Sequence, residues 1–190
     1  MQIADKKALR KHFKEVRINM PFTEKEKADS KIAANFLDSE DYINCKDILM
    51  YVSSEIEVST RLVMEKALLE KRVFCPRCED GTNIMYFYKI NSFSQLEKGS
   101  FGILEPSKEC EICGNFNETS VCLVPGLSFD EKGYRLGFGK GFYDRFLKNF
   151  KGIKTGLCYE TCLSQNLPSD IFDITVDKLI TEKNIRDFSD

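Results

Sequence analysis

The chain has 190 residues, the usual size of one domain, and we expect residues 1–190 to form a single domain. Apolar residues make up 42% and charged residues 31%, which excludes low-complexity, collagen-like and disordered chains. The net charge of −2 gives little support to binding of nucleic acid, and no apolar run approaches the length of a membrane span. No signal peptide is visible, so we expect a cytoplasmic protein whose thiols stay reduced.

Helical and strand patterns alternate through the first half of the chain. The first helix has apolar positions four, three and four residues apart (Leu9, Phe13, Val16 and Met20). Lys6, Arg10 and Arg17 fall along one edge of this apolar stripe, where a long cation either extends past the core to water or faces a ligand. Helices over 28–37 and 62–68 and buried strands over 48–52 and 72–75 are expected next.

The second half adds further strands and one short helix. Strands are expected over 84–90, 101–104, 120–124, 154–159 and 176–181, and a helix from 142 to 147, while residues 107–119 read as a polar surface loop. Strands that alternate with helices predict an α/β fold, with a mostly parallel sheet and helices on both faces.

The segment 124–147 carries the densest chemical information. Gly137, Gly139 and Gly141 alternate immediately before the expected helix, and Arg135 and Lys140 add positive charge. Glycine lets the backbone approach a ligand closely, and a helix start offers free N–H groups, so the pattern favours a phosphate site. It matches neither of the two common phosphate-binding motifs, and a tight turn without a ligand remains the alternative.

Carboxylates in the same part of the chain suggest a divalent cation. Asp144 lies on the first turn of the helix, where it could cap the helix or hold Mg²⁺ beside phosphates. Asp173 and Asp177 are candidates for a second carboxylate.

Segment 124–147 also resembles the signature of the 5-formyltetrahydrofolate cyclo-ligase family, in which Val-Pro-Gly precedes a Phe-Asp turn and then Gly-x-Arg-Leu-Gly-x-Gly-x-Gly-Tyr-Tyr-Asp. Further resemblance lies at Lys6 and Arg10, in the strand and acidic turn 50–57, and in the C-terminal region. It implies a Rossmann-like three-layer α/β/α fold. It also implies ATP- and Mg²⁺-dependent conversion of 5-formyltetrahydrofolate to 5,10-methenyltetrahydrofolate, with phosphorylation of the formyl oxygen, ring closure by N10, and release of ADP and phosphate.

The resemblance assigns roles residue by residue. It implies the following ATP contacts: Lys6, Arg10, Arg135, Gly137, Gly139, Lys140, Gly141 and Tyr143. Of these, Arg135, Lys140 and Tyr143 are expected to act in catalysis. Magnesium ligands are implied at Asp144 and Asp177, and folate contacts at Met50, Glu55 and Phe101. Taken alone, Met50 and Phe101 could be core residues and Glu55 a solvated acid. Phe142 replaces the family's usual tyrosine.

The cysteines are not explained by the resemblance. Cys75 and Cys78 form one Cys-x-x-Cys pair, and Cys110 and Cys113 form another. Two such pairs are typical of a structural zinc site, although four unconnected thiols are the alternative. A zinc-stabilised nucleic-acid-binding module is therefore a competing function, as is a related ATP-dependent ligase that acts on another small amide or carboxylate. The leading expectation is a monomeric enzyme whose partners are small molecules, not nucleic acid or a membrane.

Overall fold

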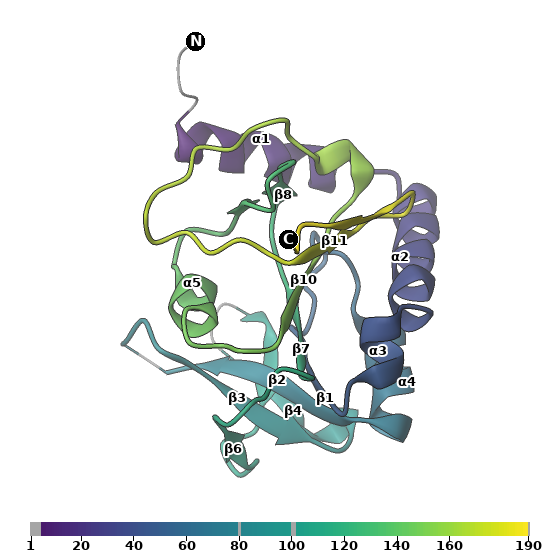
Figure 1. The fold of residues 1–190 in the computed structure, drawn as a ribbon, viewed down its shortest axis with the longest axis vertical. Helices are drawn as coiled ribbons and strands as arrows, with labels where there is room; N and C mark the ends of the chain where they lie inside the picture. The colour runs from purple at the N-terminus through teal and green to yellow at the C-terminus, as the bar shows by residue number, and fades with distance from the viewer. Residues whose placement is uncertain (1–4, 80, 100–101, 190) are drawn as a thin grey trace.

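An eight-stranded sheet runs through the residues described by the structure, a computed structural model that covers residues 5–79, 81–99 and 102–189. The inner strands are parallel, and antiparallel strands close both edges (Figure 1). Across the sheet the order is β12 (Ile185–Asp187), β11 (Lys178–Ile180), β10 (Ile153–Leu157), β7 (Val121–Val124), β1 (Asp47–Leu49), β2 (Arg72–Cys78), β3 (Met85–Ile90) and β6 (Ile112–Cys113).

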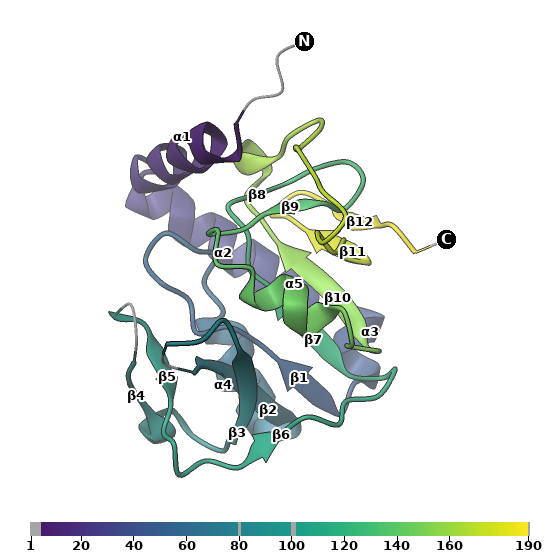
Figure 2. The ribbon, with the colours of Figure 1, turned by 90° about the vertical axis from the view of Figure 1, so that its left-hand side faces the viewer.

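Helices cover both faces of this sheet. The helices are α1 (Lys6–Ile18), α2 (Phe22–Leu37), α3 (Glu40–Asn44), α4 (Arg61–Glu70) and α5 (Phe142–Leu147). Figure 2 shows α5 on the near side of the sheet and α2, which packs against α3 and α4, on the far side. The chain passes from β1 through α4 to β2 in one direction and from β7 through α5 to β10 in the other. Because such crossovers are right-handed, α4 and α5 lie on opposite faces.

The predicted α/β fold with a mostly parallel sheet is confirmed. Strands β7 and β1 are fully or almost fully buried, as expected for central parallel strands covered on both faces. No described helix is both long and apolar enough to cross a bilayer.

Short elements account for most of the differences from the predicted ranges. The hairpins β8 (Ser128–Phe129) with β9 (Arg135–Leu136) and β4 (Leu96–Lys98) with β5 (Leu104–Pro106) contain strands too short to show a period. Strand β6 falls inside the predicted loop 107–119, where its pairing with β3 decides its conformation. Strand β1 ends at Leu49, so the chain from Met50 to Thr60 forms a loop. A single-turn 3₁₀ helix, η3 (Glu160–Cys162), follows β10.

The strand order places a topological switch point between β1 and β7. From these two neighbours the chain leaves in opposite directions, so the loops after them separate at the carboxyl edge of the sheet. In open α/β sheets this is where a crevice for ligands forms.

Candidate functional site

A cavity of about 1030 Å³ lies at this switch point. Tyr51 and Val52, which follow β1, and Pro125, which follows β7, form its floor. Its walls come from α1, the turn before α5, the start of α5, the segment 170–174, the segment 103–105 and the adjoining ends of β2 and β3. The volume is at the upper end of the range for sites that hold cofactors or small ligands.

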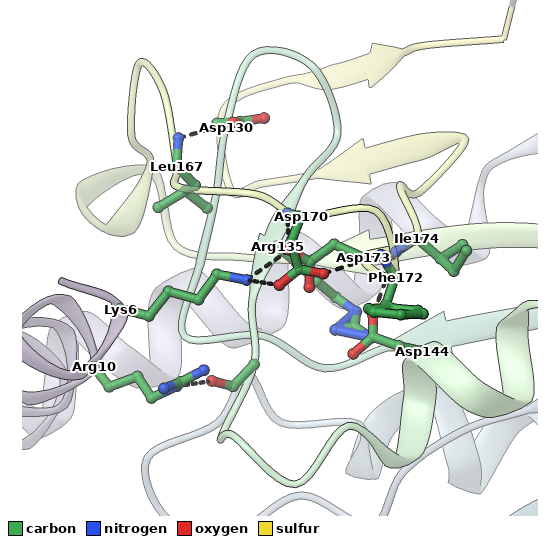
Figure 3. A network of polar contacts seen from close by, with 11 residues as sticks. Lys6, Arg10, Asp130, Arg135, Asp144, Leu167, Asp170, Phe172, Asp173 and Ile174 are labelled. Carbon is green, nitrogen blue, oxygen red and sulfur yellow. Dashed lines mark hydrogen bonds and ion pairs between the residues drawn. The ribbon is translucent and has the colours of Figure 1, made fainter. Parts of the chain in front are cut away.

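Helix α1 contributes cations to one wall of the cavity. Arg10 Nε donates to the Gly137 carbonyl at 2.9 Å, and Lys6 Nζ lies 2.6 Å from Asp173 Oδ2 and 3.0 Å from Asp170 Oδ2 (Figure 3). Burial opposes the charge of Lys6, but the two carboxylates outweigh it and raise the pKa of the lysine above its usual value. The edge position predicted for Lys6 and Arg10 is therefore a position in the cavity wall.

The glycine-rich turn forms the adjoining wall. Gly137, Gly139, Lys140 and Gly141 all line the cavity. Gly139 has φ +100° and Gly141 has φ +67°, a region that side chains with a Cβ rarely adopt. A Cβ on Gly139 would lie 3.3 Å from Arg10 Cζ, so glycine at this position also leaves room for the guanidinium.

A buried ion pair lies beneath this turn. Arg135 Nη2 donates to Asp144 Oδ1 at 2.7 Å, and the arginine side chain is only 4% exposed (Figure 3). Burial lowers the pKa of Arg135 from its usual value, and the Asp144 carboxylate opposes this effect. The pair fixes the Arg135 guanidinium in the cavity wall, with Asp144 balancing its charge.

Tyr143 adds an unpaired donor to the same wall. Its hydroxyl is buried, and none of the described residues offers it a hydrogen-bond partner. Burial raises the pKa of this phenol well above its usual value, so the hydroxyl stays protonated and can donate. Buried hydroxyls are normally paired, and this unpaired one belongs to a residue that lines the cavity.

The structure separates the two candidates for the second carboxylate. Asp173 lines the cavity with Asp144, and both interact electrostatically with Arg135. Asp177 precedes β11 at the amino edge of the sheet, where its carboxylate pairs with Lys154 at 2.9 Å. Because the cavity lies at the carboxyl edge, the structure does not bring Asp177 together with Asp144.

Among the residues that it describes, the structure does not place those expected to contact folate in the cavity wall. Met50 is fully buried and Glu55 is exposed, and neither lines the cavity. Phe101 lies outside the described residues. Glu57 does line the cavity, is 7% exposed, and accepts from the Ser54 backbone N–H and hydroxyl at 2.8 Å each. Sequence reasoning missed Glu57, although it belongs to the same acidic turn.

The zinc site expected from the two cysteine pairs is not formed. Cys75 and Cys78 both lie within β2, and residues three apart on a strand point to opposite faces. Cys75 is fully buried opposite Tyr88, and burial raises its pKa, which disfavours the thiolate that zinc binds. Among the described residues, which include all four cysteines, no three His, Cys, Asp or Glu side chains form a group that could hold a metal ion. The structure therefore gives no support to the competing function, a zinc-stabilised nucleic-acid-binding module.

Comparisons with known proteins agree with this architecture. The model of the 5-formyltetrahydrofolate cyclo-ligase family matches residues 2–182. A 5-formyltetrahydrofolate cyclo-ligase of Haemophilus influenzae is 27% identical, covering 92% of this chain and 96% of its own length. A probable 5-formyltetrahydrofolate cyclo-ligase of Schizosaccharomyces pombe is 31% identical, covering 82% and 84%.

A solved structure shows that the likeness extends to the whole fold. The NMR structure of Aquifex aeolicus 5,10-methenyltetrahydrofolate synthetase superposes with a TM-score of 0.83 at 35% identity, covering 97% of this chain and 93% of that one. Since the family model spans nearly the entire chain and the fold agrees with that of a 5,10-methenyltetrahydrofolate synthetase, this protein belongs to the 5-formyltetrahydrofolate cyclo-ligase family, a family of ligases.

Proposed function

We propose that this protein converts 5-formyltetrahydrofolate and ATP to 5,10-methenyltetrahydrofolate, ADP and phosphate. The observation that carries the proposal is the cavity at the switch point, where a cationic glycine turn and a buried acid, Glu57, share one space.

The glycine-turn side of the cavity fits a triphosphate. Lys6, Arg10 and Lys140 line it together with the buried Arg135, and the turn keeps its backbone accessible through glycine. Catalysis of phosphoryl transfer is largely positioning and charge stabilisation, so these cations are the groups expected to stabilise the transferring phosphoryl.

The donor set also fits Mg²⁺. This ion usually takes one or two carboxylates and completes its shell with water and phosphate oxygens. Asp144 and Asp173 lie in the same cavity and interact with the same arginine, which makes them the carboxylates proposed to hold it. Bound Mg²⁺ supplies neutralisation of phosphate charge. Asp177, which the family resemblance implies instead, is the alternative second ligand.

The chemical difficulty is that the oxygen of a formamide is a poor leaving group. In the proposed course this oxygen takes the γ-phosphoryl group and ADP leaves. The folate N10 then attacks the formyl carbon, loses its proton, and phosphate departs with the oxygen. No protein nucleophile is needed. Arg135 and Lys140 stabilise negative charge, and the Tyr143 hydroxyl donates its hydrogen bond to an oxygen of the reacting groups.

The decisive experiment mixes the protein with MgATP and 5-formyltetrahydrofolate and follows the near-UV absorbance of the methenyl product. We expect a rise that requires both ATP and the folate. If ATP is hydrolysed only with another amide or carboxylate, the related-ligase alternative replaces this proposal.

Replacing Gly139 by alanine is expected to raise the KM for ATP by about tenfold. A side chain at φ +100° is strained by about 1–3 kcal/mol, and the new Cβ would approach Arg10 Cζ at 3.3 Å. Steady-state kinetics with varied ATP measure the effect. Gly114→Ala is the control, since its Cβ meets nothing within 4 Å, and it should change nothing. An unchanged KM for ATP in Gly139→Ala would remove the turn from the ATP site.

Glu57→Gln is expected to raise the KM for 5-formyltetrahydrofolate by roughly 10- to 100-fold, because a charged hydrogen bond to the ligand is lost. The amide oxygen can still accept from Ser54, so the loop should keep its conformation. The matched control is Glu55→Gln, an exposed acid two residues away. If Glu55→Gln alone impairs folate binding, the role implied by the resemblance is correct and that of Glu57 is not.

A further inference from the structure

Arg17 is a cation of α1 that does not line the cavity but contacts the loops around it. The residue is only 3% exposed. Nη1 donates to the Ile56 carbonyl at 3.0 Å and Nη2 to the Gly126 carbonyl at 2.6 Å. Its Cζ lies 5.3 Å from the centroid of the Tyr159 ring. One guanidinium therefore joins the segments that follow β1, β7 and β10.

The two accepting carbonyls are next to residues of the cavity. Ile56 precedes Glu57, and Gly126 follows Pro125, and both neighbours line the cavity wall. The peptide groups on both sides of Glu57 are contacted, since the Tyr159 hydroxyl lies 3.1 Å from the Glu57 carbonyl oxygen. Arg17 and the Tyr159 ring that packs against it thus set where the Glu57 backbone lies.

The chemistry of Arg17 is poorly explained by packing alone. A buried cation is costly, and an apolar side chain of similar size is often equally good or better for stability. Besides the two carbonyls, the Arg17 guanidinium contacts the Tyr159 ring and lies 3.9 Å from Cys158 Sγ, and its Nε has no hydrogen-bond partner among the described residues. A planar guanidinium, however, can reach carbonyls on two separate loops at once.

We infer that Arg17 is a positioning residue, which fixes Glu57 and the turn after β7 against α1 and so sets the geometry of the folate side of the cavity. This inference rests on the proposed function. It gives α1 two tasks: Lys6 and Arg10 line the cavity directly, and Arg17 holds the backbone next to Glu57 and Pro125, which also line it.

The test compares Arg17→Met and Arg17→Lys with the wild-type chain in steady-state kinetics. Arg17→Met should raise the KM for 5-formyltetrahydrofolate by about tenfold or more and change the KM for ATP by less than about twofold. Arg17→Lys keeps the positive charge but lacks the planar guanidinium that reaches both carbonyls, so it should have a smaller effect in the same direction. Lys11→Met is the control on the same helix, because Lys11 is 80% exposed, and it should behave as wild type.

A double-mutant cycle with Glu57→Gln separates positioning from general destabilisation. If Arg17 acts through Glu57, the double variant should be little worse for folate KM than Glu57→Gln alone. Additive effects, or equal rises in both KM values, would overturn the inference. If Arg17→Met fails to fold, the same double-mutant cycle is measured with Arg17→Lys in its place. An inactive wild-type chain would instead reject the proposed function itself.

Discussion

Asp144→Asn is expected to lower turnover by more than about 100-fold. The change removes a carboxylate proposed to hold Mg²⁺ and leaves Arg135, which is 4% exposed, without its charge partner. A 100-fold loss of turnover corresponds to about 2.7 kcal/mol of lost transition-state stabilisation, whereas the broken ion pair lowers the stability of the fold and is a separate effect. Turnover should be measured below the melting transition, with the concentration of Mg²⁺ varied.

A second ion pair distinguishes this effect from loss of stability. Asp41 pairs with Lys178 at 2.9 Å, its side chain is 10% exposed, and neither residue lines the cavity. Asp41→Asn should lower Tm but leave turnover close to wild type. If both variants lose turnover in proportion to their loss of stability, or if Asp144→Asn stays fully active, the assigned role of Asp144 is contradicted.

Asp173→Asn is expected to lower turnover by about 10- to 100-fold and to raise the concentration of Mg²⁺ needed for half-maximal activity. Asp173 lies in the cavity with Asp144, and Lys6 Nζ is 2.6 Å from its carboxylate. The variant therefore removes both a proposed metal ligand and the anchor of a proposed phosphate-binding cation. Activity over a range of Mg²⁺ concentrations measures both consequences.

The matched variant is Asp177→Asn, which changes a carboxylate paired with Lys154 at the other edge of the sheet. We expect its dependence on Mg²⁺ to equal that of wild type. The opposite result, with Asp177→Asn impaired and Asp173→Asn normal, would restore the pair Asp144 and Asp177 as the metal ligands and reject the use of Asp173.

The fold was predictable wherever an element buries a continuous stripe. Helix α1 and strand β7 were predicted to within a few residues, because their apolar residues follow the period of the element. The β8–β9 hairpin was not predicted, since strands of two residues carry no period and depend on their partner for every hydrogen bond. Strand β6 was missed for the same reason.

The kinds of residue in the site were predictable from the sequence, but the individual acids that belong to it were harder to choose. The glycines and cations of 135–141 were recognised together because they are adjacent in the sequence and lie in one wall. Glu57 and Asp173 were harder to select, because each has a second acid within four residues, and only the path of the loop decides which one faces the cavity.

The sequence by itself determined the α/β class, the family resemblance and the turn before α5, since periodic burial and a dense local motif are properties of neighbouring residues. Tertiary structure alone decided which carboxylates meet, that Cys75 and Cys78 lie on opposite faces of one strand, and that Arg17 joins loops 39 and 109 residues away. These outcomes depend on strand order and on the edge of the sheet at which each loop ends, and no local pattern encodes either.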